Sequence, residues 1–199
     1  NTERIIRRAR ALGIRHISFW GSSLENLKKR PLPETQALLR IYEEYFTKLL
    51  GDEEVHKDRA RINFIGHWEE QFPGSLKKIM NQCQESTKDY GQYFLNFFLA
   101  YSGDHEMLQA IRSIASEFEG RSGEITEETV KSHLLTRDLP PVDFLIRTGG
   151  EPHLSAGFMM WDVANAQLFF SEKHYPDFDE NEFSLAIEDY QNRARRFGK

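Results

Sequence analysis

The alternation of strand-like and helix-like segments is the feature that most constrains the fold of this chain. Short runs of β-forming, mostly apolar residues predict strands over 14–20, 61–66, 93–101, 141–146 and 166–170. Apolar residues at helical spacing predict helices between and around them, over 5–12, 34–50, 75–87, 104–119, 126–135 and 181–196. Because parallel strands need long crossover connections, this order predicts an α/β fold with a mostly parallel central sheet and helices on both faces. We see no linker or repeat, and expect a single domain over 1–199.

Composition excludes some classes of protein. The net charge of −5 argues against a nucleic-acid partner, which would require a basic face. The only cysteine, Cys83, has no partner for an intrachain disulfide, which is typical of a reducing compartment, and we expect it to be a partly buried, inert thiol. No apolar run reaches the roughly 20 residues of a membrane-spanning helix. We therefore expect a cytoplasmic protein, and the start at Asn1 within a helical pattern suggests that an N-terminal segment is missing.

The most informative loop follows the predicted strand 141–146. Parallel α/β sheets bind ligands at the carboxyl ends of their strands, so loops after strands are the first places to look. Here Arg147 is followed by Thr148, Gly149 and Gly150. Glycines let backbone N–H groups approach an anion, and a guanidinium binds phosphate oxygens in pairs. The pattern fits a phosphate site, and it equally fits a structural turn in which Arg147 pairs with a neighbouring carboxylate.

Two other loops follow predicted strands. Residues 21–33 are rich in polar and cationic side chains, which suits a diphosphate but also suits a solvated loop. Residues 102–105 are small or polar and allow a tight strand-to-helix turn, in which Asp104 would be a natural helix cap. The cationic residues 193–196 near the end of the chain would favour the dipole of the last helix even without a further role.

These loops, taken in order along the chain, resemble the cis-prenyltransferase family, which includes the undecaprenyl diphosphate synthases. Ile146–Glu151 is identical to the family's Ile-Arg-Thr-Gly-Gly-Glu. Five other segments are similar to family motifs at matching places: Ser22–Pro31, Ala100–Asp104, His153–Ser155 with Phe158–Trp161, Gln167–Phe170 with Tyr175–Phe178, and Arg193–Gly198. The shared order makes the resemblance much more specific than any single motif.

The resemblance implies a reaction and its partners. A cis-prenyltransferase condenses isopentenyl diphosphate onto an allylic diphosphate, here farnesyl or geranylgeranyl diphosphate, to make a long-chain polyprenyl diphosphate. The allylic diphosphate ionises at C1, the double bond of isopentenyl diphosphate attacks, and loss of a proton leaves a cis double bond. The family uses Mg²⁺ to neutralise the diphosphate. The resemblance also implies a homodimer that is peripheral to the membrane receiving its product. It further implies a hydrophobic tunnel, lined by the apolar face of 34–50 and by Phe94, Phe97 and Leu99.

The family's functional residues can be carried over one by one. Asn26 would be catalytic, close to the reacting carbons and to the transferred proton. Arg196 and Gly198 match an ending that reaches the active site of the partner subunit. The full set of implied substrate-binding residues is Ser22, Ser23, Glu25, Leu27, Arg30, Arg147, His153, Ser155, Arg196 and Gly198.

Departures from the family pattern indicate a divergent member. The family's Asp-Gly-Asn-Gly-Arg-Trp segment would precede every residue present here, which is the basis for expecting a missing N-terminal segment. Gln167 stands at the family's second metal carboxylate, His153 at a clamp arginine and Asp104 at a turn arginine. These changes leave a second function open, that of a non-catalytic partner subunit or scaffold. The length of the product and the choice of primer are also left open by the sequence.

Overall fold

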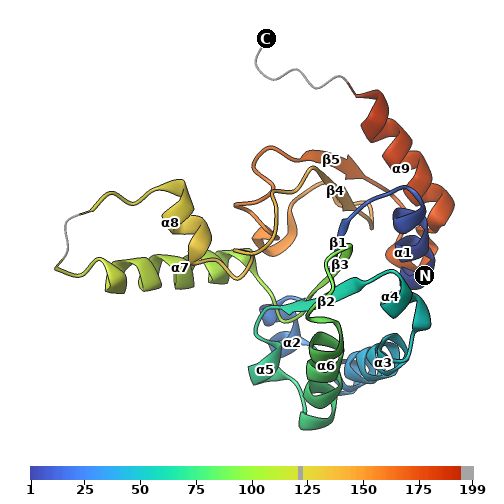
Figure 1. Cartoon of the computed structure of the whole chain (residues 1–199), viewed down its shortest axis with the longest axis horizontal. Coiled ribbons are helices and arrows are strands. Elements are labelled where there is room, and N and C mark those ends of the chain that lie inside the picture. The colour runs from blue at the N-terminus through green and yellow to red at the C-terminus, as the bar shows by residue number, and fades with distance from the viewer. Residues whose placement is uncertain (121–122, 194–199) are drawn as a thin grey trace. The chain divides into compact units, whose positions relative to one another are not determined.

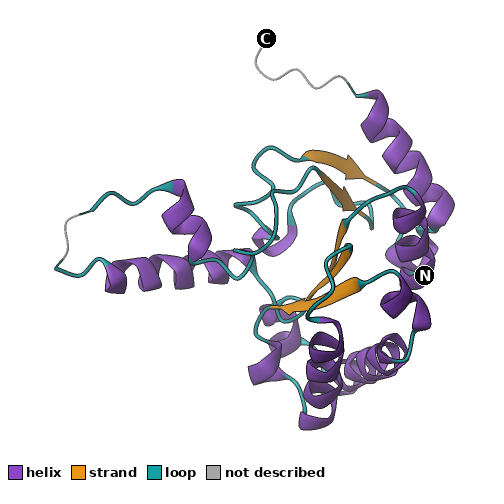
Figure 2. Cartoon of the chain, viewed as in Figure 1, coloured by secondary structure: helices purple, strands orange, loops and turns teal. Residues whose placement is uncertain are grey.

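The computed structural model describes residues 1–120 and 123–193, which form an α/β fold (Figures 1 and 2). Its elements are α1 Thr2–Ala11, β1 His16–Trp20, α2 Leu24–Lys29, α3 Leu32–Leu50, α4 Glu53–Lys57, β2 Ala60–Ile65, α5 Trp68–Gln71, α6 Gly74–Thr87, β3 Tyr93–Phe98, α7 Gly103–Glu117, α8 Glu127–Ser132, β4 Phe144–Arg147, β5 Gln167–Phe170 and α9 Glu180–Asn192, with short 3₁₀ turns at Ser155–Gly157 and Tyr175–Asp177. The chain divides into two compact units. Each unit is described by itself.

The larger unit, residues 15–138 with 156–158, is built on a three-stranded parallel sheet in the order β1-β3-β2. Phe97 of β3 lies between Phe19 of β1 and Phe64 of β2 in the register of the sheet. The three strands run in one direction, so they end at one common edge. The loops that carry polar residues therefore leave the sheet from the same side.

One face of this sheet is covered by α3 and α6. The ring of Phe46 on α3 is 4.7 Å from that of Phe64 and 5.3 Å from that of Phe97, centroid to centroid. Leu76 and Met80 of α6 are fully buried. Each such side chain contributes about 1.5–3 kcal/mol by leaving water, so this aromatic layer is a main source of stability.

Cys83 lies in the same layer. Its thiol is buried, and it donates a hydrogen bond to the carbonyl oxygen of Phe46 at 3.5 Å. Burial raises the pKa of the Cys83 thiol to about 11, so the reactive thiolate is scarce at neutral pH. The thiol is fully buried, which goes beyond the partial burial expected from the sequence, and its raised pKa agrees with the expected low reactivity.

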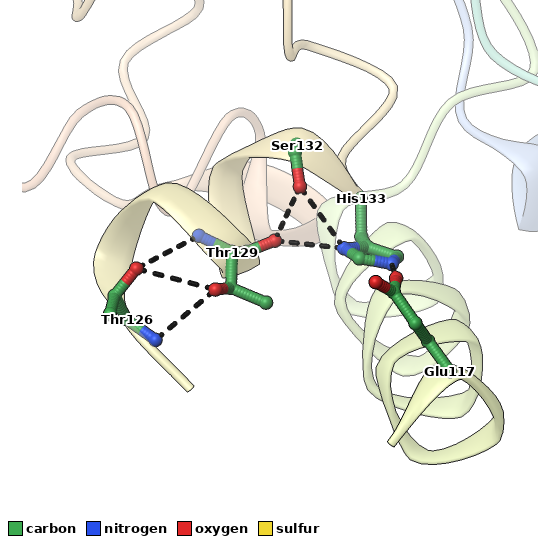
Figure 3. Close-up of polar contacts among 5 residues, drawn as sticks. All are labelled: Glu117, Thr126, Thr129, Ser132 and His133. Atoms are coloured by element: carbon green, nitrogen blue, oxygen red, sulfur yellow. Dashed lines mark hydrogen bonds and ion pairs between the residues drawn. The ribbon is translucent and has the colours of Figure 1, made fainter. Parts of the chain in front are cut away.

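Polar contacts tie α8 to α7 at the end of the larger unit (Figure 3). Thr126 caps α8, because its hydroxyl accepts from the N–H of Thr129 at 3.2 Å while the Thr129 hydroxyl accepts from the N–H of Thr126 at 3.3 Å. His133 follows the helix and places Nε2 2.8 Å from a carboxylate oxygen of Glu117 on α7.

The smaller unit comprises 1–14, 139–155 and 159–199. Its sheet pairs β4 with β5 in parallel, so that Arg147 lies opposite Phe170. The helix α1 lies against α9, where Arg8 Nε donates to Ser184 Oγ at 2.8 Å and Arg4 forms a 3.4 Å ion pair with Glu180.

The parallel α/β class predicted from the sequence is confirmed, and every predicted strand is present. Three short helices were missed, of which α2 matters most because it lies in the region predicted as a loop over 21–33. The last helix ends at Asn192, before the predicted end at 196, because Arg193 has an extended backbone. The single domain over 1–199 stays a prediction.

Candidate functional site

A tightly packed turn follows β1 at the carboxyl edge of the larger unit's sheet. The N–H of Gly21 donates to the carbonyl oxygen of Phe98 at 2.9 Å, which continues the strand pairing by one residue. A Cβ atom on Gly21 would lie 2.8 Å from Leu99 Cδ2 and 2.8 Å from the hydroxyl oxygen of Tyr42. A side chain at position 21 would have to displace the side-chain tips of Leu99 and Tyr42, so the phenol of Tyr42 occupies the space that it would need.

Ser22 and Ser23 are both buried, and the hydroxyl oxygen of each accepts a hydrogen bond from a backbone N–H group. Ser22 Oγ accepts a hydrogen bond from the N–H of Ala100 at 3.1 Å, which ties the end of β1 to the segment after β3. Ser23 is the N-cap of α2, because its Oγ accepts from the N–H of Asn26 at 3.0 Å. Each hydroxyl group accepts in these contacts and still has its own O–H to donate.

The helix α2 carries the other residues predicted for this loop. Asn26 and Glu25 are exposed, and Leu27 is half-buried. Glu25 forms a 3.1 Å ion pair with Lys29, and Arg30 Nε lies 4.0 Å from Glu34 Oε2. These pairs are exposed and contribute little to stability, which leaves the side chains free to reorient toward a ligand.

Arg147 leaves the end of β4 in the smaller unit and is held by a single carboxylate. Its Nη2 is 3.0 Å from Glu151 Oε2, and its Nε donates to the carbonyl oxygen of Glu151 at 3.4 Å. The same Glu151 Oε2 lies 3.8 Å from His153 Nδ1. Glu151 therefore places an anionic group between two basic side chains that the sequence predicts to bind a diphosphate.

The two glycines of this loop do not present their N–H groups to a ligand, and here the sequence interpretation was wrong. The N–H of Gly149 donates to the carbonyl oxygen of Lys173 at 2.8 Å, and that of Gly150 donates to Ser171 at 3.0 Å. Both residues have positive φ, 95° and 73°. Glycine is needed for the turn itself, which aims Arg147 and Glu151.

Ser155 and Gln167 complete the predicted residues of the smaller unit. Ser155 is half-buried and begins a 3₁₀ turn. Gln167 begins β5, and its Oε1 is buried without a hydrogen-bond partner in the described part of the chain. Arg196 and Gly198 lie outside the described residues.

The described residues do not fit a Mg²⁺ site. Over 1–120 and 123–193, no group of three or more His, Cys, Asp or Glu side chains is placed to hold a metal ion. Gln167 offers one neutral amide oxygen, whereas Mg²⁺ favours carboxylates and phosphate oxygens. Gln167 alone is therefore a weak basis for a metal centre.

The fold and the two loops together define a class of protein. It is a parallel α/β protein with a polar turn after β1 and an arginine loop after β4, both suited to phosphate-bearing ligands. The sequence predicts both loops but gives no signal for two residues. Glu151 appears in it only as one position of a motif, and Tyr42 only as one position of an apolar helix face.

Comparisons with known proteins name the family. The sequence profile described as "Putative undecaprenyl diphosphate synthase" matches residues 1–198. The tritrans,polycis-undecaprenyl-diphosphate synthase (geranylgeranyl-diphosphate specific) of Thermococcus kodakarensis is 36% identical over 200 residues, which covers 99% of this chain and 75% of that protein. The isoprenyl transferase of Listeria innocua is 36% identical over 199 residues, covering 98% and 77%. The chain belongs to the undecaprenyl diphosphate synthase family of cis-prenyltransferases.

A solved structure supports the same assignment. Lavandulyl diphosphate synthase from Lavandula x intermedia, in complex with dimethylallyl diphosphate, superposes with a TM-score of 0.92 at 30% identity. The match covers 100% of this chain and 85% of that one. The resemblance stated from the motifs is confirmed.

Proposed function

We propose that this protein is a cis-prenyltransferase that condenses isopentenyl diphosphate onto an allylic diphosphate. The names of its relatives support a prenyl transferase that uses these substrates. The observation that carries the proposal is the Glu151 carboxylate between Arg147 and His153. A carboxylate in this position marks where an anionic ligand would be held, and it lies in the motif that is identical to the family's.

In this proposal, each part of the chain has a defined task. Arg147, His153 and Ser155 bind the diphosphate of isopentenyl diphosphate and so orient its double bond. Asn26, next to the Ser22–Ser23 turn, lies by the reacting carbons. A bond forms between the two substrates, the bond between C1 and the diphosphate oxygen breaks, and a proton leaves the isopentenyl unit. Most of the acceleration comes from holding the substrates together and from stabilising separated charge.

The cofactor, primer and product form the finer part of the proposal. We propose Mg²⁺ as an ion that accompanies the diphosphate, since phosphate oxygens are ligands it favours. The relative from Thermococcus kodakarensis is named as specific for geranylgeranyl diphosphate, which makes that primer the first to test. Lavandulyl diphosphate synthase binds dimethylallyl diphosphate, so a short primer is the second.

The proposal also includes the protein's assembly and location. We propose a homodimer in which Arg196 and Gly198 reach the partner's site, as the family resemblance implies. We further propose a cytoplasmic enzyme that delivers its product to a membrane from the surface. Among the described residues, no helix combines the length and apolar character that crossing a bilayer requires.

A non-catalytic partner subunit is the alternative. His153, Gln167 and Asp104 favour it, because each differs from the residue expected in the family. Asp104 lies in the first turn of α7, where its carboxylate accepts from the N–H of His105 at 2.9 Å, and the N-cap of the helix is Ser102 instead of Asp104 as the sequence suggested.

The first prediction separates the two functions. We expect the protein in its full natural length to incorporate labelled isopentenyl diphosphate into geranylgeranyl, farnesyl or dimethylallyl diphosphate with Mg²⁺ present. Extracted products would be resolved by thin-layer chromatography. No incorporation with any of these primers and any divalent metal, from a folded protein, would favour the non-catalytic subunit.

A second prediction concerns Glu151. If its carboxylate occupies the place of a diphosphate, Glu151→Gln should lower the dissociation constant for isopentenyl diphosphate by about two- to fivefold, because an exposed ion pair is worth only about 0–1 kcal/mol. Titration calorimetry measures this. The matched control is Glu85→Gln, which removes an exposed carboxylate paired with Lys88 on α6 and should change nothing. Weaker binding by Glu151→Gln would show instead that Glu151 holds Arg147 in its productive orientation.

A further inference from the structure

The hydroxyl of Tyr42 is buried, and its O–H has no acceptor among the described residues. Tyr42 lies on α3, is 9% exposed, and packs its ring against Phe46 and Phe72 with centroids 6.0 and 5.9 Å away. The Ser22 hydroxyl is placed to donate to the phenol oxygen, which leaves the proton of Tyr42 itself without a partner. A buried donor that loses its water contacts without gaining an acceptor destabilises the fold.

The oxygen lies at the polar turn after β1. It approaches Gly21 so closely that a Cβ there would be 2.8 Å away, and the next residue is Ser22. Burial raises the pKa of Tyr42, and the nearby Ser22 hydroxyl and the charge of Arg30 offset only part of this effect. Tyr42 is therefore neutral near pH 7 and has an O–H to donate.

The neighbours of this O–H restrict what it could bind. Ser22 accepts from the N–H of Ala100 and directs its own proton to the phenol oxygen, so Tyr42 is the hydroxyl left to donate to a ligand. Arg30 adds a positive charge at the same end of the sheet. A hydroxyl donor and a cation suit a ligand with anionic oxygen acceptors. A hydrocarbon chain offers no acceptor, so the tunnel role assigned to this helix face does not explain the hydroxyl.

We propose that Tyr42 is a further substrate-binding residue, whose hydroxyl donates a hydrogen bond to a phosphate oxygen of a diphosphate bound at the carboxyl end of β1. The inference rests on the proposed function, because it takes the diphosphate substrates as the ligands. It adds a residue on α3 to those that the family motifs supply.

The test is Tyr42→Phe, which removes one oxygen and nothing else. Without ligand, the melting temperature should rise by about 2–4 °C, since an unsatisfied buried group is lost. With inorganic diphosphate as the probe, the dissociation constant should rise about tenfold, because a hydrogen bond to a charged group is lost. In the incorporation assay, the KM should rise more than kcat falls. Inorganic phosphate in a parallel titration shows whether both phosphoryl groups are needed.

The matched control is Tyr90→Phe in the same unit. The Tyr90 hydroxyl lies 3.1 Å from His56 Nδ1, just before the amino end of β3, so its loss should leave diphosphate binding unchanged and should not raise the melting temperature. If Tyr42→Phe melts lower than the parent and binds diphosphate equally well, its hydroxyl is satisfied by a buried water and the proposal is wrong. If Tyr42→Phe and the parent bind diphosphate equally well, the proposed role of Tyr42 is wrong, whatever their melting temperatures. The proposed function still stands in that case, provided that the parent incorporates isopentenyl diphosphate. A parent that neither binds diphosphate nor incorporates isopentenyl diphosphate overturns both.

Discussion

Arg147→Ala should raise the apparent KM for isopentenyl diphosphate about tenfold or more and should also lower kcat, while the fold is retained. A charge-assisted hydrogen bond is worth roughly 1.5–3 kcal/mol, and each 1.4 kcal/mol is a factor of about ten. Phosphate contacts that tighten as charge separates would act on kcat as well. The pair with Glu151 is partly exposed, so its loss should cost about 1 kcal/mol of stability or less. Steady-state kinetics and thermal melting measure both effects.

The control for this prediction is Arg4→Ala in the same unit. Arg4 is also paired with a carboxylate, that of the half-buried Glu180, at 3.4 Å, and its removal changes the net charge equally. We expect normal kinetics from this variant. If Arg147→Ala keeps normal kinetics but melts at a lower temperature, the guanidinium only stabilises the turn. If both variants lose activity alike, the effect comes from total charge and not from the site.

The strands could be predicted because burial dictates their composition. The segment over 93–101 is apolar at nearly every position, and β3 lies in the middle of its sheet with Phe98 and Leu95 buried. A central parallel strand must pack on both faces, so the sequence signal is strong. The strand order could not be predicted in the same way, because it depends on side-chain packing between segments far apart in the chain.

The helix α2 was missed because its signal is local and weak. Only six residues long, it buries a single side chain, Leu24, and apart from the half-buried Leu27 its other residues are polar. Its start depends on the Ser23 cap, and serine is equally common in loops. The structure thus turns a predicted polar loop into a short helix that displays Asn26 and Glu25 on its exposed surface.

The arginine loop shows what a motif can and cannot predict. The sequence predicted the place of Arg147 correctly and left open whether it pairs with a carboxylate, which it does. It did not predict that the glycine N–H groups bond to the segment 171–173, because that contact joins parts of the chain about 20 residues apart. The Tyr42 hydroxyl was missed for a related reason, since helical periodicity treats tyrosine as one apolar position.

The last prediction tests the proposed homodimer through the C-terminal residues. If Arg196 and Gly198 serve the partner's site, two defective chains should restore each other. One chain carries Arg147→Ala, and the other lacks residues 196–199. In a mixed dimer of two-fold symmetry, one site would carry both defects and the other neither, so about half of the parent activity should return.

The experiment co-expresses the two variants with different tags, purifies the mixed dimer through both tags, and measures incorporation of isopentenyl diphosphate. Each variant purified alone is the control, and light scattering confirms that a dimer is assayed. Removal of residues 196–199 need not alter the fold, because α9 ends at Asn192 and its buried residues Phe183 and Ala186 lie well before the cut. A confirmed mixed dimer no more active than either variant would mean that the tail acts within its own chain. A monomer at micromolar concentration would exclude the shared site, because each chain would then have to supply all of its own diphosphate-binding groups.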